Sequence, residues 1–182
     1  MTIRLQTSGD AAQIEALLDR AFGPDRKKKS SYRLRDGVPA IPSLSFVNVL
    51  DDGRITATLR FWPIAIGEER IPALLLGPLA VEPGMQGLGF GKALMRHGLE
   101  MARAEGHAIV VLVGDPDYYR PFGFSRALTR DLAMPGPTDP ERFLALELEP
   151  GALEGIAGLV GKAPAKRRAA PQAAATFAFA EP

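Results

Sequence analysis

The first third of the chain changes from strand-like to helix-like spacing of apolar residues. Ile3 and Leu5 alternate with polar residues, which predicts a short strand at the start. A set of apolar residues then recurs every three or four positions and predicts a helix that ends at Gly23 and Pro24. The residues in this set are Ile14, Leu17, Leu18, Ala21 and Phe22.

Two polar features accompany this pattern, and a second helix follows them. Asp10 followed by Gln13 resembles a capping box at the start of the first helix. One arginine and three lysines at 26–29 are expected to form a solvated turn, with attraction of an anionic cofactor tail as the alternative. A short second helix is expected over residues 31–35.

Apolar runs in the middle of the chain predict three consecutive strands. Residues 43–50 and 54–66 are two strands joined by a hairpin turn, Asp-Asp-Gly, at 51–53. Pro63 inside the second run indicates an irregularity or a sheet edge. The third strand covers 71–81 and ends in an apolar run, as expected of a buried strand.

The segment after this third strand is rich in glycine and begins a helix. A short turn leads into residues 86–92, Gln-Gly-Leu-Gly-Phe-Gly-Lys, and the following helix stops near Gly106. Glycines at alternate positions leave backbone N–H groups uncovered where a helix start already has unpaired donors and a partial positive charge. The strand, turn and helix are therefore suited to hold a phosphate-bearing ligand against the main chain.

The spacing of these glycines excludes two common phosphate-binding signatures. The nucleotide-binding loop G-x-x-x-x-G-K-[ST] would need a glycine in place of Gln86 and a hydroxyl in place of Ala93. The dinucleotide fingerprint G-x-G-x-x-G would need its third glycine in place of Lys92 or Leu94. A glycine-rich turn without a ligand stays open as the alternative.

The six residues from Gln86 to Gly91 have the pattern Q-x-x-G-x-G, and here the chain resembles the GNAT superfamily of acyl-CoA-dependent N-acetyltransferases. The resemblance implies that the amides of this segment bind the pyrophosphate of coenzyme A. It also implies that the end of the preceding strand pairs with the pantetheine arm, as in strand addition. The implied cofactor-binding residues are Leu79, Val81, Gln86, Gly87, Leu88, Gly89, Phe90, Gly91, Lys92 and Asp115.

A second segment strengthens the resemblance. Residues 107–114 predict another buried strand, and Tyr119 lies four residues before Gly123 and Phe124, as a Tyr of a short helix does in this family. The two segments stand in the family's order and separation, and the resemblance covers roughly residues 1–150. The residues around Tyr119 are similar to a bacterial branch often called YhbS-like predicted acetyltransferases.

The resemblance implies an α/β fold of the GNAT acyl-CoA N-acyltransferase type, with a mixed, mostly antiparallel central sheet flanked by helices. The implied order is β-α-α-β-β-β-α-β-α-β-β, in which 124–133 and 142–149 are the two closing strands. We expect one domain over residues 1–161. Residues 162–182 are rich in Ala, Pro and basic residues without periodicity, and are expected to form a flexible tail.

Acetyl transfer needs a proton donor for the leaving thiolate and a way to obtain a neutral amine. The family uses the Tyr at the position of Tyr119 as general acid, and a phenol with a pKa of about 10 is protonated at pH 7; packing is the alternative. Glu82, directly or through water, and Asp115 are candidate bases, with a turn or surface role as the alternative for each. A backbone amide near Leu79 or Val81 could polarise the thioester carbonyl.

Composition narrows the mechanism, the partners and the compartment. The chain has 182 residues and no cysteine, so direct attack in a ternary complex is the natural mechanism and thiolate metal sites are excluded. His97 and His107 are expected to be structural, and no metal is expected. The apolar stretches are too short to span a membrane and the N-terminus does not resemble a signal peptide, so a cytoplasmic location is expected. The net charge of +1 argues against bulk nucleic-acid binding.

The predicted function is acetyl transfer from acetyl-CoA, as cosubstrate, to a primary amine of a small molecule or a peptide. Tyr32, Arg60 and Trp62 are candidates to line the cleft, with a core position as the alternative for Trp62. Dimers are common in the family, so a homodimer is an open expectation. The alternative functions are a non-catalytic acyl-CoA-binding regulatory module of the same fold, a transferase that modifies protein lysines or N-termini, and a binding partner that acts through the basic tail.

Overall fold

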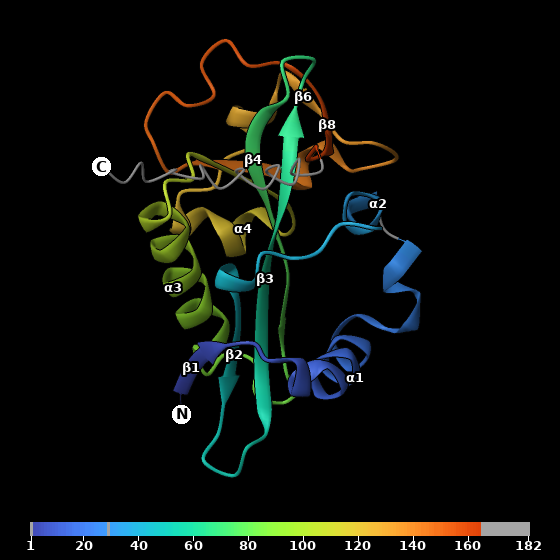
Figure 1. Cartoon of the computed structure of the whole chain (residues 1–182), viewed down its shortest axis with the longest axis vertical. Coiled ribbons are helices and arrows are strands. Elements are labelled where there is room, and N and C mark those ends of the chain that lie inside the picture. The colour runs from blue at the N-terminus through green and yellow to red at the C-terminus, as the bar shows by residue number, and fades with distance from the viewer. Residues whose placement is uncertain (1, 29, 165–182) are drawn as a thin grey trace, which may run out of the picture.

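A computed structural model of the protein describes residues 2–28 and 30–164. Within these residues the elements follow the predicted order, with one additional strand at the end (Figure 1). The helices are α1 (Ala11–Phe22), α2 (Ser30–Arg35), α3 (Phe90–Ala104) and α4 (Pro116–Tyr119). The strands are β1 (Thr2–Leu5), β2 (Ser45–Val49), β3 (Ile55–Ile66), β4 (Ile71–Val81), β5 (Ile109–Val113), β6 (Leu132–Ala133), β7 (Phe143–Glu147) and β8 (Gly158–Lys162).

The strands form one mixed sheet in the order β1-β2-β3-β4-β5-β7, to which β8 adds by pairing with β3 and β6. The long strands β3 and β4 run through its centre (Figure 1). Neighbouring strands are antiparallel except for β4 with β5 and β6 with β8, which are parallel. The predicted mixed, mostly antiparallel sheet is therefore confirmed.

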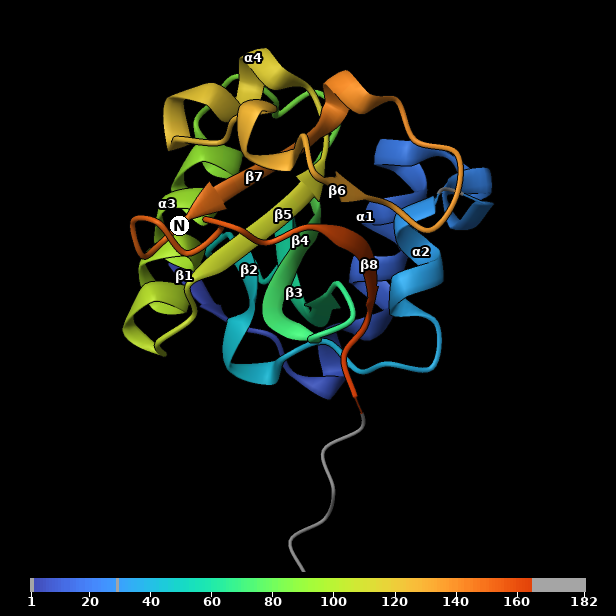
Figure 2. The ribbon, with the colours of Figure 1, turned by 90° about the horizontal axis from the view of Figure 1, so that it is seen from above.

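Helices cover both faces of this sheet (Figures 1 and 2). α3 packs on one face, where its apolar side joins Leu74 and Leu76 of β4 in a single buried cluster. The other face is covered by α2, whose Leu34 shares a cluster with Leu75, and by α1, which packs against Ala80. Because successive residues of β4 are buried on opposite faces, the strand is apolar throughout rather than alternating.

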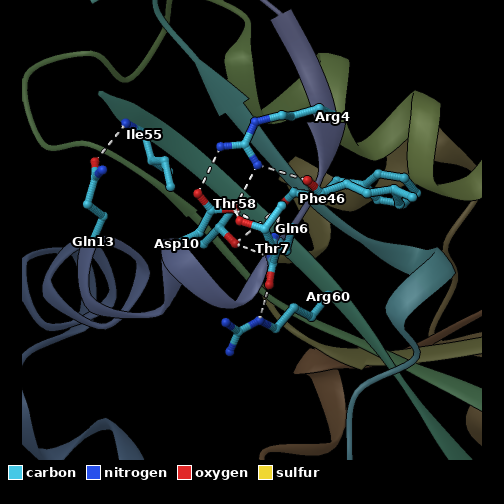
Figure 3. Close-up of polar contacts among 10 residues, drawn as sticks. Arg4, Gln6, Thr7, Asp10, Gln13, Phe46, Ile55, Thr58 and Arg60 are labelled. Atoms are coloured by element: carbon cyan, nitrogen blue, oxygen red, sulfur yellow. Dashed lines mark hydrogen bonds and ion pairs between the residues drawn. The ribbon is translucent and has the colours of Figure 1, made fainter. Parts of the chain in front are cut away.

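The predicted capping box of Asp10 and Gln13 is wrong. Asp10 instead accepts a hydrogen bond from the backbone N–H of Thr7 at 2.7 Å and forms a bidentate ion pair with Arg4 (Figure 3). Oε1 of Gln13 accepts a hydrogen bond from the backbone N–H of Ile55 at 3.2 Å, which links α1 to β3. The sequence pattern was misleading because both side chains bond outside the first turn of α1.

The predicted strand over 124–133 is also wrong in most of its length. Only the last two residues form β6, while Ser125 makes an isolated bridge to Ala145 of β7. The buried hydroxyl of Thr129 donates a hydrogen bond of 2.7 Å to the carbonyl oxygen of Phe143, which holds the intervening turn against β7. This segment satisfies its polar groups through single contacts rather than through a strand ladder.

The additional strand β8 was not predicted. It contains glycines at both Gly158 and Gly161, and only Val160 is buried, so it lacks the period-two pattern of a strand. β8 ends at Lys162, one residue beyond the expected domain boundary. Residues 165–182 of the expected tail lie outside the described residues.

Pro63 lies within β3 at a local edge. β3 pairs with β2 as far as Arg60 and with β8 from Ile64 onward, so Pro63 falls between these two partners. On its other side it lies opposite Leu74 of β4. The irregularity predicted from this proline is therefore a change of partner strand along one side of β3.

Candidate active site

A cavity of about 720 Å³ lies where β4 and β5 separate. The two parallel strands pair only through Leu74 with Val110 and Leu75 with Val111. Beyond this point β4 continues beside β3 and β5 continues beside β7, so the sheet opens between them. The residues that line the opening include Leu76, Gly77, Pro78, Leu79, Gln86, Gly87, Lys92, Val113, Gly114, Asp115, Tyr118 and Tyr119.

The edge of β4 that faces the opening has no strand partner after Leu75 within residues 2–28 and 30–164. Backbone N–H and C=O groups on such an edge are available to an extended ligand with amide groups of its own. The segment 76–81 therefore offers a binding edge that leads to the glycine-rich residues 86–92, here called the glycine segment.

A bulge in β4 shapes the wall of this cavity. The pairing of β3 with β4 slips by one residue, so that Gly77 and Pro78 together lie opposite Arg60. Nε1 of Trp62 donates a hydrogen bond of 2.7 Å to the carbonyl oxygen of Gly77. Gly77 has a φ of +117°, a conformation that residues with a side chain rarely adopt.

The glycine segment ends in an open helix start. Gly89 is the N-terminal cap of α3 with a φ of +90°, and Gly87 has a φ of +83°. A Cβ added at either glycine would meet no atom within 4 Å, so both face open space. The first turn of α3 contains no acidic residue, which leaves its positive end available to an anion.

Gly91 has a different role from Gly87 and Gly89, because it is buried. A Cβ at this position would lie 2.6 Å from the hydroxyl oxygen of Tyr118 and 3.2 Å from Cγ2 of Val81. The missing side chain therefore allows the start of α3 to pack closely against β4 and α4.

The predicted cofactor-binding residues fall into two groups. The residues that line the cavity are Leu79, Gln86, Gly87, Lys92 and Asp115. The residues that adjoin it, in the end of β4, the turn and the start of α3, are Val81, Leu88, Gly89, Phe90 and Gly91.

Two tyrosines of α4 line the cavity with their rings packed edge to face at 4.9 Å. The ring of Tyr119 lies on Gly114, where a Cβ would come within 2.2 Å of it. Burial raises the pKa of Tyr119, and the neighbouring Tyr118 and Asp115 raise it further. Burial also raises the pKa of Tyr118. Both phenols are therefore protonated at neutral pH.

The two candidate bases are both engaged in other contacts. Glu82 forms a bidentate ion pair with Arg20 of α1, with N–O distances of 2.7 and 2.8 Å, and these bonds lower the pKa of Glu82. Asp115 caps α4, since its Oδ1 accepts a hydrogen bond of 3.0 Å from the backbone N–H of Asp117. Of the two, Asp115 lines the cavity.

A second cavity of about 550 Å³ lies under α2. Tyr32, Arg60 and Trp62 line it, and Tyr32 also lines the cavity between β4 and β5. Arg35 lines both cavities and was not predicted from the sequence. The only local signal for this arginine was its position in the predicted second helix.

Arg26 corrects the expectation of a solvated turn at 26–29. Its side chain is 3% exposed and bonds to Asp19, Glu15 and the hydroxyl of Tyr32. Burial alone would lower the pKa of Arg26, but these bonds outweigh burial and the net effect is a raised pKa. Because Arg26 stands among basic residues in the sequence, its burial among polar partners could not be predicted from the local pattern.

The two histidines lie outside both cavities. His97 packs edge to face on Phe46, with ring centroids 4.8 Å apart, and burial lowers the pKa of His107. The described part of the chain holds no group of three or more His, Asp or Glu side chains placed to bind a metal ion. Likewise, no helix in residues 2–28 and 30–164 is long and apolar enough to cross a membrane.

An open sheet with a cavity between two parallel strands, bordered by a glycine-rich helix start, defines an acyltransferase-like fold. Residues 2–127 match the family described as acetyltransferase (GNAT) domain. The chain is also 34% identical over 160 residues to the N-acetyltransferase YhbS of Escherichia coli, which covers 88% of this chain and 95% of that protein. The chain therefore belongs to the GNAT acetyltransferase family.

Two solved structures extend the comparison. The crystal structure of YhbS from Escherichia coli in complex with CoA superposes with a TM-score of 0.77 at 33% identity, over 88% of each chain. The structure of a GNAT family acetyltransferase from Brucella melitensis in complex with acetyl-CoA has a TM-score of 0.57 at 30% identity, over 80% of this chain and 94% of that chain.

Proposed function

We propose that this protein transfers the acetyl group of acetyl-CoA to a primary amine by direct attack in a ternary complex. The observation that carries the proposal is the opening between β4 and β5, since it places an unpaired strand edge next to the open start of α3. An amide-containing arm fits the edge, and a pyrophosphate fits the helix start. The relatives crystallised with CoA and acetyl-CoA support the same cosubstrate here.

In this proposal the backbone of Leu79 and Val81 pairs with the pantetheine arm. The amides from Gln86 to Gly91 bind the pyrophosphate, and the exposed ammonium of Lys92 adds a positive charge beside it. Leu88 and Phe90 present backbone amides in the same turn, and Asp115 borders the far wall of the cavity.

The reaction joins the amine nitrogen to the thioester carbonyl carbon and breaks the carbon–sulfur bond. The thiolate sulfur takes the phenolic proton of Tyr119, and the attacking amine gives up a proton to a base. Tyr119 suits the first task because it lines the cavity and holds its proton at neutral pH. With no cysteine in the chain, a cysteine acyl-enzyme is excluded.

The base has to act on an amine that is neutral in only about one molecule in a few thousand at pH 7, given a pKa of about 10.4. The proposed base is Glu82. It acts after Arg20 releases it, because a carboxylate paired with an arginine has a lowered pKa and accepts a proton poorly. Asp115 is the alternative within the cavity. Replacing each carboxylate by its amide, and comparing the acid limb of the kcat/KM profile, distinguishes them.

A calorimetric titration with acetyl-CoA tests the cosubstrate site. Gly89→Glu places a carboxylate at the open helix start and should abolish binding. Gly106→Glu is the matched control, because Gly106 follows the other end of α3, has a similar φ of +80° and also faces open space. Loss of binding in both variants, or in neither, would contradict the proposed site.

Turnover distinguishes an enzyme from a module that only binds acyl-CoA. Release of free CoA that depends on an added primary amine, measured with a thiol reagent, supports acetyl transfer. Binding without amine-dependent release across a broad amine panel would support the non-catalytic alternative.

A further inference from the structure

The cavity under α2 is strongly basic. Its lining contains five cationic side chains and two carboxylates, those of Glu15 and Asp36. The carboxylate of Glu15 is already bonded to Arg26, and the side chain of Asp36 is 89% exposed to solvent. The cations are Arg26, Lys27, Arg33, Arg35 and Arg60.

Arg35 is enclosed without a matching negative charge. Its Nε is buried and has no hydrogen-bond partner, and no carboxylate of residues 2–28 and 30–164 lies within ion-pair distance of its guanidinium. The guanidinium instead lies over the rings of Tyr32, at 4.7 Å, and Trp62, at 5.8 Å. Burial lowers the pKa of Arg35 to about 10, and the nearby Arg60 and Arg26 contribute to this shift.

Arg60 is held in place by a neutral amide, and its ion pair with Glu15 is long. Its Nε donates a hydrogen bond of 2.8 Å to Oε1 of Gln6, whose amide nitrogen bonds to Phe46 and Thr58 (Figure 3). Its nearest carboxylate oxygen, on Glu15, is 3.9 Å from Nη1. Burial lowers the pKa of Arg60. The side chain is thus fixed on β3 with donors left over.

The basic cavity adjoins the cavity between β4 and β5. Both are lined by Arg26, Tyr32, Arg35 and Pro78. Pro78 belongs to the bulge of β4 that faces Arg60. A ligand in the basic cavity would therefore lie across the bulge from the cavity proposed for the thioester.

We infer that the basic cavity binds an anionic group of the acceptor, a carboxylate or a phosphate carried on the same molecule as the amine, through Arg35 and Arg60. This inference rests on the proposed function. Two fixed guanidinium groups with free donors are suited to the oxygen pairs of such anions. The acceptor would place its anion under α2 and its amine at the bulge.

Matched pairs of amines test the inference. The carboxylate pairs are β-alanine with propylamine and L-phenylalanine with phenethylamine; the phosphate pair is O-phosphoethanolamine with ethanolamine. We expect the anionic member to have a kcat/KM about ten- to a hundredfold higher, as charge-assisted hydrogen bonds provide. The preferred pair then shows whether the anion is a carboxylate or a phosphate.

Three variants locate the effect. Arg60→Gln and Arg35→Met should remove the preference mainly by raising KM for the anionic amine, with kcat less affected. Arg54→Gln is the control, since Arg54 lies just before β3 in an exposed pair with Asp52 and changes the net charge equally. Equal use of both members of every pair, or a preference that survives in Arg60→Gln, would overturn the inference.

Fluorescence gives a readout that does not depend on turnover. Trp62 is the single tryptophan of the chain and lines the basic cavity. Inorganic phosphate or acetate should change its emission in a saturable way at constant ionic strength, and Arg60→Gln should abolish this change. If acetyl-CoA binds and Trp62 shows no saturable response to either anion, the inference fails while the proposed function stands. If acetyl-CoA does not bind, the proposed function itself fails.

Discussion

The indole Nε1 of Trp62 donates a hydrogen bond of 2.7 Å to the carbonyl oxygen of Gly77. This bond joins the middle of β3 to the bulge of β4, at the wall between the two cavities. Regular pairing between β3 and β4 is interrupted at the bulge. The carbonyl oxygen of Gly77 is therefore satisfied by the side chain of Trp62, where a backbone N–H would serve elsewhere in the sheet.

Trp62→Phe should therefore loosen the bulge. The carbonyl of Gly77 loses a buried donor, and we expect the free energy of unfolding to fall by about 1–3 kcal/mol. Urea denaturation followed by far-UV circular dichroism measures this change. An unchanged midpoint would show that water or another donor replaces the indole.

Tyr119→Phe should reduce kcat by about 10²–10⁴ if its hydroxyl supplies the proton to the thiolate. The affinity for acetyl-CoA should change little, because the ring and its packing on Gly114 are kept. Tyr118→Phe is the matched control, since its hydroxyl lies beside Gly91 at the glycine segment and should affect affinity for acetyl-CoA more than kcat. Similar losses of kcat in both variants would argue against a specific acid.

Asp10 should make stability depend on acid pH. The hydrogen bonds from Arg4 hold the pKa of Asp10 well below its ordinary value of 3.8. As pH falls below 3.8, the carboxyl of Asp10 is protonated in the unfolded chain while it is still ionised in the folded protein. The stabilisation is therefore complete above pH 3.8 and is lost as pH falls through the folded pKa.

Asp10→Asn should thus lower the free energy of unfolding at neutral pH by about 1–3 kcal/mol and flatten its decline in acid. Asp52→Asn serves as the comparison, because Asp52 also pairs with an arginine but is exposed, where ion pairs contribute little. Parallel acid profiles for Asp10→Asn and the parent protein would contradict the assignment.

Gly91→Ala should strain the contact between α3 and α4. The new methyl group would lie 2.6 Å from the hydroxyl oxygen of Tyr118, so that side chain has to move. We expect destabilisation of about 1–3 kcal/mol, measured by thermal unfolding. Adding Tyr118→Phe removes the clashing oxygen and should restore part of the loss; additive effects in the double variant would show that the two residues do not interact.

The sequence predicted the features that depend on local pattern. The helical spacing after Asp10, the buried strand over 71–81 and the glycine-rich start of α3 each lie within one continuous segment. The order of elements followed from these segments and the family resemblance. Such features are visible because residues that act together are also neighbours in the chain.

The features that escaped prediction depend on distant contacts. β8 is a strand because β3 and β6 pair with it, although its own residues show no strand pattern. The surroundings of Arg35 are formed by residues of another element, since its guanidinium lies over the ring of Trp62 and near Arg60, both in β3. The capping box expected of Asp10 and Gln13 failed for the same reason, since their side chains bond to Arg4 of β1 and Ile55 of β3.

The helix α3 meets the sheet through two buried glycines, Gly91 and Gly98. A Cβ at Gly98 would come within 2.8 Å of both Leu59 and Phe61, just as one at Gly91 would touch Tyr118. Two such close contacts, about two turns apart, hold the inner side of α3 closely against its neighbours. A larger side chain at either glycine would therefore shift the glycine segment, whereas exposed positions further along α3, such as Arg96 and Glu100, lie outside the cavity lining and suit labels or immobilisation.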